Sequence, residues 1–356
     1  MLAVTAPTYT DPSRYELSNV PKPKATEPTD VVIQVYAASI NPVDVKKVDG
    51  IFKQAVKDSF PYKISYDAAG VVVQIGKDVK ALKVGDEVYT RLLEVNRGSW
   101  SEFVKCAEKF IALKPKNITF SDAASLTLAG VTALQVLRQY KGSLDGKTVL
   151  IPGGLSGTGA FACQLAKNVF HAGKVITTVS TTKVTKVHEL LGAGVVDEII
   201  DYTKNSPIEL IPPRSVDFLF DTTGQSMEFL PLLKPTTGII VSISAIPSAE
   251  TLQAHDVMLR PDNPRIPLLI RLYLNAGDSI QKLKAWYYGV DYKCWLLEPN
   301  GKDLTTLKCY VEDGKLVPVI GARIDLDDIT QVRQACQVTY SGKGGLGKTV
   351  FDVIKE

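Results

Sequence analysis

A segment near the middle of the chain restricts the fold more than any other. The strand-forming residues KTVLIP (147–152) lead into the turn GGLSGTG (153–159), and the helix-forming residues AFACQLAK (160–167) follow. Glycines let the backbone pass close to a pyrophosphate, and the free N–H groups at a helix N-terminus point toward it. The spacing is not the strict G-x-G-x-x-G, so a glycine turn that serves packing alone is the competing interpretation. The position between a strand and a helix favours a dinucleotide site.

Strands and helices alternate on both sides of this turn. Helical spacing of Ala and Leu predicts a helix over 121–140, for which Ser121 is the expected N-cap. The predicted parallel strands lie at 147–154, 174–180, 196–202, 216–224 and 237–244, and further predicted helices lie at 159–170 and 185–194. Alternation at these lengths is typical of an α/β protein with a doubly wound parallel sheet.

The first third of the chain has a different pattern, because its apolar residues alternate with period two. This pattern predicts an antiparallel barrel with strands at 28–36, 67–76, 83–90 and 100–106. The last part is expected to return to this barrel, with helices at 301–316 and 328–340 and strands at 318–326 and 348–354. We therefore predict a first domain at 1–122, a parallel-sheet domain at 123–285, and a C-terminal part of the first domain at 286–356.

Composition limits the partners and the compartment of this 356-residue chain. Its net charge is only +3 and no run of like charge stands out, so we predict no nucleic-acid partner. The apolar tract RIPLLIRLYL (265–274) is interrupted by Arg271 and is too short to cross a bilayer, so we predict no membrane span. Five scattered cysteines without a C-x-x-C pair, and no secretory leader, predict a cytoplasmic protein without a disulfide framework.

The residues after the second parallel strand test which nicotinamide cofactor the turn would hold. A sheet that binds NAD ends this strand with Asp or Glu, which holds the ribose 2′-hydroxyl. Here Ser180 is followed by TTKVTK (181–186), so hydroxyls and the ammonium groups of Lys183 and Lys186 occupy the corner. These groups suit a 2′-phosphate and favour NADPH. The other interpretation is that the two lysines solvate an exposed helix face.

Eight segments, in order along the chain, carry a resemblance to a known superfamily. They are ASINPVDVKKVDG (38–50), YDAAGVVVQIGKDV (66–79), KVGDEVY (83–89), SWSEFV (99–104), DAASLTLAGVTALQVL (122–137), VLIPGGLSGTGAFACQLAK (149–167), LGAGVVDEIIDYT (191–203) and DGKLVPVI (313–320). The chain resembles the medium-chain dehydrogenase/reductase superfamily, in its zinc-independent quinone oxidoreductase and enoyl reductase-like branch. The resemblance implies a GroES-like β-barrel domain, made of the N-terminal part and the C-terminal tail, with an inserted Rossmann domain.

The same resemblance implies the residues of a cofactor site in the cleft between the two domains. Those that match cofactor-holding positions are Ser156, Gly157, Thr158 and Gly159 at the pyrophosphate, Ser180, Lys183 and Tyr202 on the 2′-phosphate and adenosine side, Thr223 within the lining segment 221–224, and Ser242 and Ser244 near the nicotinamide. Thr132 matches a threonine beside the nicotinamide, and Asn41 and Asp44 match the polar mouth of the substrate cleft.

The residues that zinc-dependent relatives use for metal binding are replaced in this chain. Such relatives carry a Cys near the position of Asn41 and Gly-His-Glu where this chain has Ser65-Tyr66-Asp67. They also carry four clustered cysteines for a structural zinc, whereas residues 100–120 contain only Cys106. The three histidines are more readily explained as surface or packed residues than as ligands. We therefore predict no metal, and we expect hydrogen bonds to polarise the carbonyl group of a substrate.

The proton donor stays open at this point. Fatty enoyl reductases of the superfamily carry a Tyr in a G-x-Y context. The matching residues of this chain are Gly50-Ile51-Phe52, so Phe52, which cannot donate a proton, occupies the position of that Tyr. The alternatives are Tyr62, Tyr66 or a water held by Asn41, and barrel packing is the competing role for both tyrosines. The candidate catalytic residues are Asn41, Asp44, Tyr66 and Thr132.

Residues 342–349, GKGGLGKT, also fit the phosphate-loop pattern G-x-x-x-x-G-K-[ST]. A phosphate loop follows a strand and opens a helix, so that the helix N-terminus meets the phosphates. Here Tyr340 closes a predicted helix, and the strand-forming residues 350–354 come after the motif. The order is reversed, so we predict a glycine turn into the last barrel strand rather than a nucleoside triphosphatase.

These features favour an NADPH-dependent reductase of quinones or of the C=C bond of α,β-unsaturated carbonyl compounds. Phe52 weakens the interpretation as an acyl-thioester enoyl reductase. Two alternatives remain, a trans-acting enoyl reductase on carrier-bound acyl or polyketide chains and a non-catalytic NADPH-binding regulatory protein. We expect a small hydrophobic carbonyl or quinone substrate, and the resemblance also implies a homodimer formed through the edge of the parallel sheet.

Overall fold

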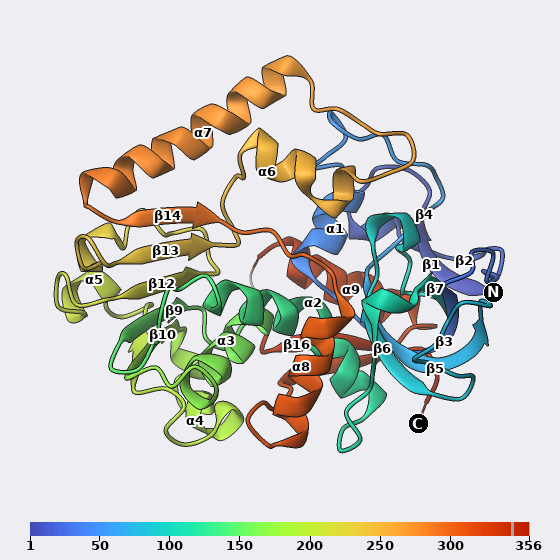
Figure 1. Ribbon diagram of the computed structural model, residues 1–356, viewed down its shortest axis with the longest axis horizontal. Helices are drawn as coiled ribbons and strands as arrows, with labels where there is room; N and C mark the ends of the chain where they lie inside the picture. Colours follow the sequence, from blue (N-terminus) through green and yellow to red (C-terminus); the bar gives the residue numbers. More distant parts are fainter. Residues whose placement is uncertain (343–344, 356) are drawn as a thin grey trace.

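The structure, a computed structural model, describes residues 1–342 and 345–355. Figure 1 shows a parallel sheet on the left and a curved, mainly antiparallel sheet on the right. The helix α2 (Phe120–Leu137) lies between them, and nearly all of its side chains are buried. This arrangement confirms the predicted α/β class with a barrel domain and a parallel-sheet domain.

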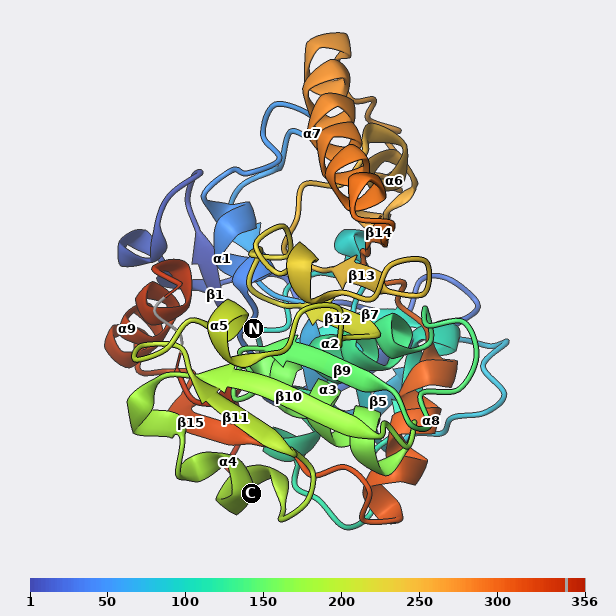
Figure 2. The same ribbon diagram turned by 90° about the vertical axis from the view of Figure 1, so that its left-hand side faces the viewer.

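The parallel sheet has the order β11-β10-β9-β12-β13-β14. Its strands are β9 (Thr148–Pro152), β10 (Lys174–Val179), β11 (Glu198–Asp201), β12 (Phe218–Asp221), β13 (Ile239–Ser242) and β14 (Asp291–Cys294). The chain starts at β9 in the middle, moves to one edge, and then returns to the other side of β9, as Figure 2 shows from the side of the sheet. The strand order therefore reverses beside β9, and ligands of doubly wound sheets bind at the carboxyl ends of the strands at such a point.

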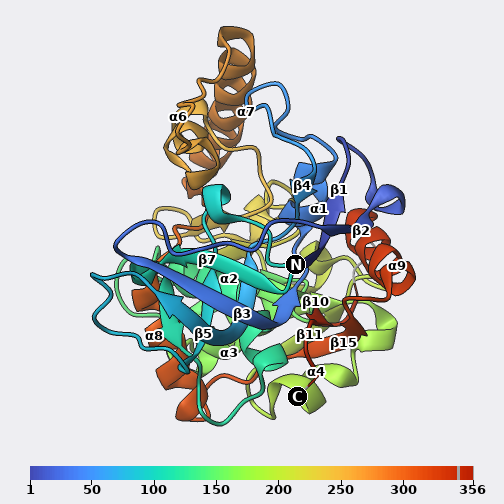
Figure 3. The ribbon, with the colours of Figure 1, turned by 90° about the vertical axis from the view of Figure 1, so that its right-hand side faces the viewer.

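The remaining helices cover the sheets or stand beside them. They are α1 (Pro42–Val48), α3 (Gly157–Asn168), α4 (Lys186–Leu191), α5 (Pro207–Leu210), α6 (Ala249–Ala254), α7 (Leu268–Tyr287), α8 (Gly301–Glu312) and α9 (Ile329–Tyr340). Figures 2 and 3 show that α6 and α7 project from one end of the molecule. The long helix α7 was not expected from the sequence.

The barrel combines strands from both ends of the chain, as the resemblance implied. Its main sheet follows the order β15-β16-β3-β5-β6-β8, with β7 paired to β3. These strands are β3 (Asp30–Ser39), β5 (Asp67–Ile75), β6 (Glu87–Arg91), β7 (Phe103–Ala107), β8 (Ile111–Leu113), β15 (Ile320–Asp325) and β16 (Lys348–Asp352). A smaller sheet contains β1 (Leu2–Ala6), β2 (Glu16–Asn19) and β4 (Tyr62–Lys63). Because β16 pairs with β3, the C-terminal strand completes the N-terminal domain.

The start of α2 corrects one prediction. Thr119, not Ser121, is the N-cap, because the Thr119 Oγ1 accepts the Asp122 N–H at 3.1 Å. The Asp122 carboxylate in turn accepts the Thr119 N–H at 3.3 Å, which completes a reciprocal capping box. The Ser121 hydroxyl instead donates to Asp352 on β16, so this residue links α2 to the barrel.

Two further features bear on the domain boundaries and on membrane insertion. The boundary predicted after residue 285 falls inside α7, and β14 beyond it extends the parallel sheet. We therefore propose the second boundary after Cys294. Within the described residues, only α2 has the length and hydropathy of a membrane span, and 89% of that window is buried inside the protein.

The phosphate-loop motif has the structural context that the sequence predicted. The helix α9 ends at Tyr340, the strand β16 begins at Lys348, and no helix follows the motif in the described residues. Two of its residues, Lys343 and Gly344, lie outside the described part of the chain. The order helix, turn, strand is opposite to that of a triphosphatase.

Candidate functional site

The glycine turn lies between β9 and α3, and its geometry requires glycine. Gly153 has φ +70°, in the left-handed region. A Cβ on Gly159 would lie 2.2 Å from the Gly153 carbonyl oxygen, so any side chain would push the helix away from the strand. Ser156 is the N-cap of α3, and its Oγ accepts the Gly159 N–H at 3.1 Å. The first-turn N–H groups of Gly157 and Thr158 have no partner within the helix, and this arrangement fits a pyrophosphate.

The structure brings Ser180, Lys183 and Tyr202 to the carboxyl ends of neighbouring strands. Ser180 follows β10 and precedes a short 3₁₀ turn that ends at Lys183. The Lys183 Nζ donates to the Gly345 carbonyl oxygen at 3.0 Å, and burial lowers the pKa of this lysine. Tyr202 follows β11 and is 55% exposed. An ammonium group and two hydroxyls therefore lie where the adenosine ribose of a dinucleotide would bind.

Sequence reasoning missed a carboxylate at this corner. Asp201 ends β11, and the register of the two strands places it opposite Val179 at the end of β10. Hydrogen bonds from Thr203 Oγ1 at 2.6 Å and Thr181 Oγ1 at 2.7 Å lower the pKa of Asp201. The sequence did contain a signal for Asp201. Neighbouring parallel strands end at the same edge of the sheet, so a carboxylate at the end of β11 lies beside the residues that follow β10.

A buried aspartate organises the carboxyl ends of β12 and β13. The Asp221 Oδ1 accepts the Gly224 N–H at 2.8 Å and the Thr223 N–H at 3.1 Å, while Oδ2 accepts the Ser242 hydroxyl at 2.7 Å. The Ser244 Oγ donates to the Thr222 carbonyl oxygen at 2.7 Å. The structure thus brings Thr223, Ser242 and Ser244 together. Ser242 is fully buried and holds Asp221, so its hydroxyl serves to fix the loop.

Asn41, Asp67 and Lys348 form a buried cluster next to the middle of α2. The Lys348 Nζ donates to the Asn41 Oδ1 at 2.5 Å and to the Ile40 carbonyl oxygen at 2.8 Å, and it lies 3.5 Å from the Asp67 carboxylate. The Asn41 Nδ2 donates to the Asp67 Oδ2 at 2.6 Å. Asp67 and Lys348 were not among the predicted site residues, and their contacts with Asn41 are too distant in sequence to leave a local pattern.

Two more predicted catalytic residues adjoin this cluster. Asp44 lies in the first turn of α1, where its Oδ2 accepts the Asn41 N–H at 2.6 Å. Burial, together with the nearby Asp67 carboxylate, raises the pKa of Asp44 to about 8. Thr132 lies on α2 and its Oγ1 donates to the Leu128 carbonyl oxygen at 2.7 Å. The Leu128 N–H donates to the Asp67 Oδ1 at 3.0 Å, so Asp67 connects the cluster to the helix that carries Thr132.

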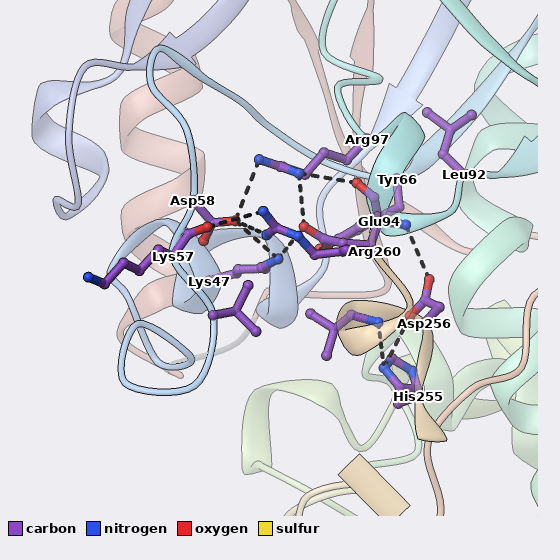
Figure 4. A network of polar contacts seen from close by, with 12 residues as sticks. Lys47, Lys57, Asp58, Tyr66, Leu92, Glu94, Arg97, His255, Asp256 and Arg260 are labelled. Atoms are coloured by element: carbon purple, nitrogen blue, oxygen red, sulfur yellow. Dashed lines mark hydrogen bonds and ion pairs between the residues drawn. The ribbon is translucent and has the colours of Figure 1, made fainter. Parts of the chain in front are cut away.

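The fourth predicted catalytic residue, Tyr66, belongs to a separate buried network, shown in Figure 4. Its hydroxyl donates to the Glu94 Oε2 at 2.7 Å, and Glu94 also pairs with Lys47 and with Arg97. Burial, with the Tyr62 and Glu94 side chains nearby, raises the pKa of Tyr66 well above its usual value. Because Tyr66 and Asp67 are consecutive in an extended segment, their side chains point to opposite faces.

The same network ties the segment after α6 to the barrel. Arg260 pairs with Asp58 at 3.0 Å (Figure 4). Asp256 pairs with Arg91 of β6. His255 lies beside Asp256 at 3.1 Å, and burial lowers the pKa of this histidine. Its position agrees with the expected role as a packed residue. These ion pairs hold residues 255–260 against the barrel beside the Asn41 cluster.

The residues at the zinc position of zinc-dependent relatives do not fit a metal ion. Asn41 and Tyr66 replace the soft and imidazole ligands that zinc prefers. The Lys348 ammonium already neutralises Asp67, so a divalent cation there would meet a like charge. Across the described residues, no group of three or more His, Cys, Asp or Glu side chains is placed to hold a metal.

Two family models match consecutive parts of the chain. The alcohol dehydrogenase GroES-like domain matches residues 27–116, and the zinc-binding dehydrogenase model matches residues 191–350. The first model covers the barrel strands β3 to β8, and the second covers the later part of the parallel sheet and the return to the barrel. The name of the second model mentions a zinc ion that the residues of this chain do not fit.

Two curated proteins illustrate the similarity. The chain is 40% identical over 235 residues to an NADPH-dependent alkenal/one oxidoreductase, chloroplastic, of Arabidopsis thaliana, and this match covers 64% of the chain and 58% of the plant protein. The chain thus spans little more than half the length of that relative. It is 29% identical to the NAD(P)H oxidoreductase RTN4IP1, mitochondrial, of Mus musculus over 92% of the chain and 82% of the mouse protein.

A solved structure extends the similarity over the whole chain. The quinone oxidoreductase from Coxiella burnetii superposes with a TM-score of 0.79 at 27% sequence identity, and the match covers 99% of both chains. The two family models, matched in order, together span more than half of the chain. With its barrel and doubly wound sheet, the chain belongs to the medium-chain dehydrogenase/reductase superfamily, in the quinone oxidoreductase and enoyl reductase-like branch.

Proposed function

We propose that the protein is an NADPH-dependent oxidoreductase that reduces quinones or the C=C bond of α,β-unsaturated carbonyl compounds. The observation that carries the proposal is the buried cluster of Asn41, Asp67 and Lys348, which puts hydrogen-bond donors where zinc-dependent relatives have a metal. Conjugated carbonyls and quinones suit such a site, because hydrogen bonds alone can polarise the oxygen that accepts charge. The names of the plant and bacterial relatives agree with this substrate class.

The residues of the parallel sheet would hold the cofactor. The N–H groups of Gly157 and Thr158 bind the pyrophosphate, and Lys183 pairs with the 2′-phosphate. Thr223 and Ser244 lie along the nicotinamide half, on loops that Asp221 and Thr222 hold in place. When bound, NADPH supplies a hydride to the electron-poor carbon of the substrate.

The cluster assigns different roles to its members. The Lys348 ammonium uses its donors on Ile40, Asn41 and Asp67, so it positions the Asn41 amide rather than contacting a substrate. The Asn41 Nδ2 gives one hydrogen to Asp67, and its second N–H is the donor for a substrate carbonyl. Asp44 is protonated at neutral pH because its pKa is about 8, so it serves as the proton reserve beside Asn41.

Steady-state kinetics with NADPH and NADH would test this proposal. We expect NADPH oxidation in the presence of enones or quinones, and we expect Asn41→Ala to lower kcat/KM by about a hundredfold, the effect of removing one carbonyl-polarising donor. Lys183→Ala should raise the KM for NADPH about tenfold without changing the KM for NADH. Lys186→Ala, at an exposed lysine nearby, is the matched control and should change neither.

Several results would contradict the proposal. Turnover absent across a broad panel of enones and quinones, or tighter binding of NADH than of NADPH, would reject it. NADPH binding without turnover, unaffected by Asn41→Ala, would favour the non-catalytic regulatory alternative. Turnover restricted to carrier-bound acyl chains would favour the trans-acting enoyl reductase.

Partners and compartment stay predictions. We propose a homodimer through the free edge of β14, the last strand of the parallel sheet, and sedimentation at several concentrations would test it. All five cysteines, each in the described chain, are free thiols. The relatives quoted above carry chloroplastic and mitochondrial names, so the cytoplasmic location remains to be tested by imaging of a tagged chain.

A further inference from the structure

Two adjoining cavities lie between α7 and the loops that follow β12 and β13. The inner cavity, of about 410 Å³, reaches Gly224 and Ser244 at the carboxyl ends of the two strands. The outer cavity, of about 460 Å³, reaches Tyr287 and Tyr288 at the end of α7. The two share Met227 and Lys284, so they form one groove along the helix, which we call the α7 groove. Figure 1 shows α7 lying alongside β14, the edge strand of the parallel sheet.

The lining of the α7 groove is largely apolar, with Ser226, Ser244 and Gln281 as its polar members and a single charged side chain. Its large hydrophobic residues include Ile246, Ile280 and Leu283, which are 37%, 55% and 64% exposed. Apolar side chains of this size remain in contact with water unless a ligand or partner covers them. No acidic residue lines either cavity within the described chain, and the only charged group is the ammonium of Lys284. A neutral hydrocarbon chain therefore fits the groove, with the methylene stem of Lys284 along it and its ammonium in water.

The inner end of the groove reaches the loops that follow β12 and β13. Gly224 is held by the Asp221 carboxylate at 2.8 Å, and Ser244 is held by the Thr222 carbonyl at 2.7 Å. Both residues therefore stand on the loops that we assign to the nicotinamide half of the cofactor. Each cavity also has the volume of a small-molecule pocket and is open to solvent along one side. A substrate whose reactive end meets the nicotinamide near Ser244 would extend its remaining chain along α7, beside β14.

We propose that the α7 groove is a subsite for the apolar tail of the substrate. The proposal rests on the proposed function and deepens it, because it makes long-chain enones or alkyl-substituted quinones the preferred substrates over short ones. Each methylene buried in the groove should raise kcat/KM about fourfold, which is the transfer free energy of one buried methylene expressed as a ratio. The rise should stop when the chain reaches the outer end of the groove beside Tyr287.

The test uses a homologous series of alkyl vinyl ketones, from methyl to decyl, with the intact protein and NADPH. Ile280→Asn puts an amide into the groove wall and should flatten the dependence on chain length, while activity on the methyl ketone stays within about twofold of wild type. Leu272→Asn is the matched control, because Leu272 is 58% exposed on the same helix and lines neither cavity. Both positions are exposed, so neither change should unfold the protein.

The outcomes separate this proposal from the proposed function. Turnover of all ketones with no dependence on chain length, or Ile280→Asn with the wild-type dependence, would overturn the subsite and leave the function intact. If no ketone is reduced, titration calorimetry with saturated alkyl methyl ketones tests the groove directly. Tighter binding of longer chains, lost in Ile280→Asn, would support the subsite. Binding that does not depend on chain length would overturn it. A dimer that dissociates in Ile280→Asn, without any change in the chain-length dependence, would assign the groove to a second copy of the chain.

Discussion

Two glycine-rich turns, 153–159 and 342–349, look alike in sequence and do different things in the structure. The first leads into the helix α3, so its glycines bring first-turn N–H groups to the edge of the sheet. The second leads into the strand β16, and of its described glycines only Gly347 passes a neighbouring segment closely. A Cβ on Gly347 would lie 2.2 Å from the Val319 carbonyl oxygen. A run of glycines thus reports close approach of the backbone, and the element that follows decides what is approached.

The two turns also touch each other. The Gly347 N–H donates to the Leu155 carbonyl oxygen at 2.8 Å, and a Cβ on Gly157 would lie 2.7 Å from the Lys348 side chain. The lysine that would bind phosphate in a true phosphate loop is instead buried between Asn41 and Asp67. The second turn therefore supports the first and supplies Lys348 to the candidate site.

The largest expected effect comes from replacing Lys348, the lysine of the second turn. Lys348→Met leaves the buried Asp67 carboxylate without its cation, so it should lower the free energy of unfolding by about 3–5 kcal/mol, as measured by urea denaturation. Lys355→Met is the control, because Lys355 pairs with Asp325 in water and should contribute at most about 1 kcal/mol. Stabilisation of the wild-type protein by ATP, lost in Lys348→Met, would contradict our interpretation and restore that of a phosphate loop.

A slightly smaller effect is expected from replacing glycines of the same turn by alanine. This comparison separates the contribution of close contact with a neighbouring segment from that of backbone strain. Gly347→Ala combines φ +58° with a clash against a backbone oxygen, so we expect a loss of about 3 kcal/mol. Gly342→Ala has a similar φ, +66°, with nothing within 4 Å, and should cost only about 1 kcal/mol in the same urea experiment. Equal losses at the two positions would show that the close contact with Val319 is unimportant.

The third prediction concerns the pH dependence of stability and Asp44, which adjoins the cluster of Asn41, Asp67 and Lys348. The pKa of Asp44 is about 8 in the folded protein and about 3.8 in the unfolded chain, so the folded state holds an extra proton between these values. The free energy of unfolding should therefore fall as pH rises from about 4 to 8, by at most about 1.4 kcal/mol per unit, and change little above that range through this group. Asp44→Asn should remove this part of the slope, measured by urea denaturation across the range. An unchanged slope would place the titrating group elsewhere.

The smallest effect tests the first turn alone. Ser156→Ala removes the N-cap of α3 and should cost about 1 kcal/mol of stability. Ser156→Asp keeps a capping oxygen but adds a negative charge where the pyrophosphate would bind, so it should keep stability and weaken NADPH binding in a fluorescence titration. If Ser156→Asp bound NADPH as tightly as the wild type, the first turn would not be the anion site.

Most of the parallel sheet could be predicted because each element carries a local signal. The strand β9, the glycine turn and α3 are contiguous, and the predicted strands overlap all of β9 to β13. The misplaced N-cap had a readable signal in the T-x-x-D spacing of Thr119 and Asp122, which outweighs the serine between them. The helix α7 was missed although its apolar residues follow a helical period, and its exposed face also carries large apolar side chains such as Trp286, 73% exposed.

The candidate site was predicted in part, since local motifs marked Asn41 and Asp44 and the structure brings them together. The partners that give the cluster its charge were not predicted, because Lys348 lies 307 residues from Asn41 in sequence. Tyr66 was named as an alternative proton donor because Phe52 occupies the tyrosine position of the enoyl reductases, yet alternation along an extended strand directs its side chain to the network of Glu94. Only the folded chain shows which polar residues face one another.

The pairing of β16 with β3 has a consequence for the order of events on the ribosome. Residues 30–39 emerge early, but the strand that closes their sheet and the ammonium that neutralises Asp67 emerge only after the entire nucleotide-binding unit has been synthesised. Until then the end of β3 at residues 37–39 lacks its neighbouring strand and the Asp67 carboxylate lacks its cation, so this end of the sheet is open to association with other nascent chains. We expect the growing polypeptide to depend on chaperones during translation far more than the mature molecule does once it is released.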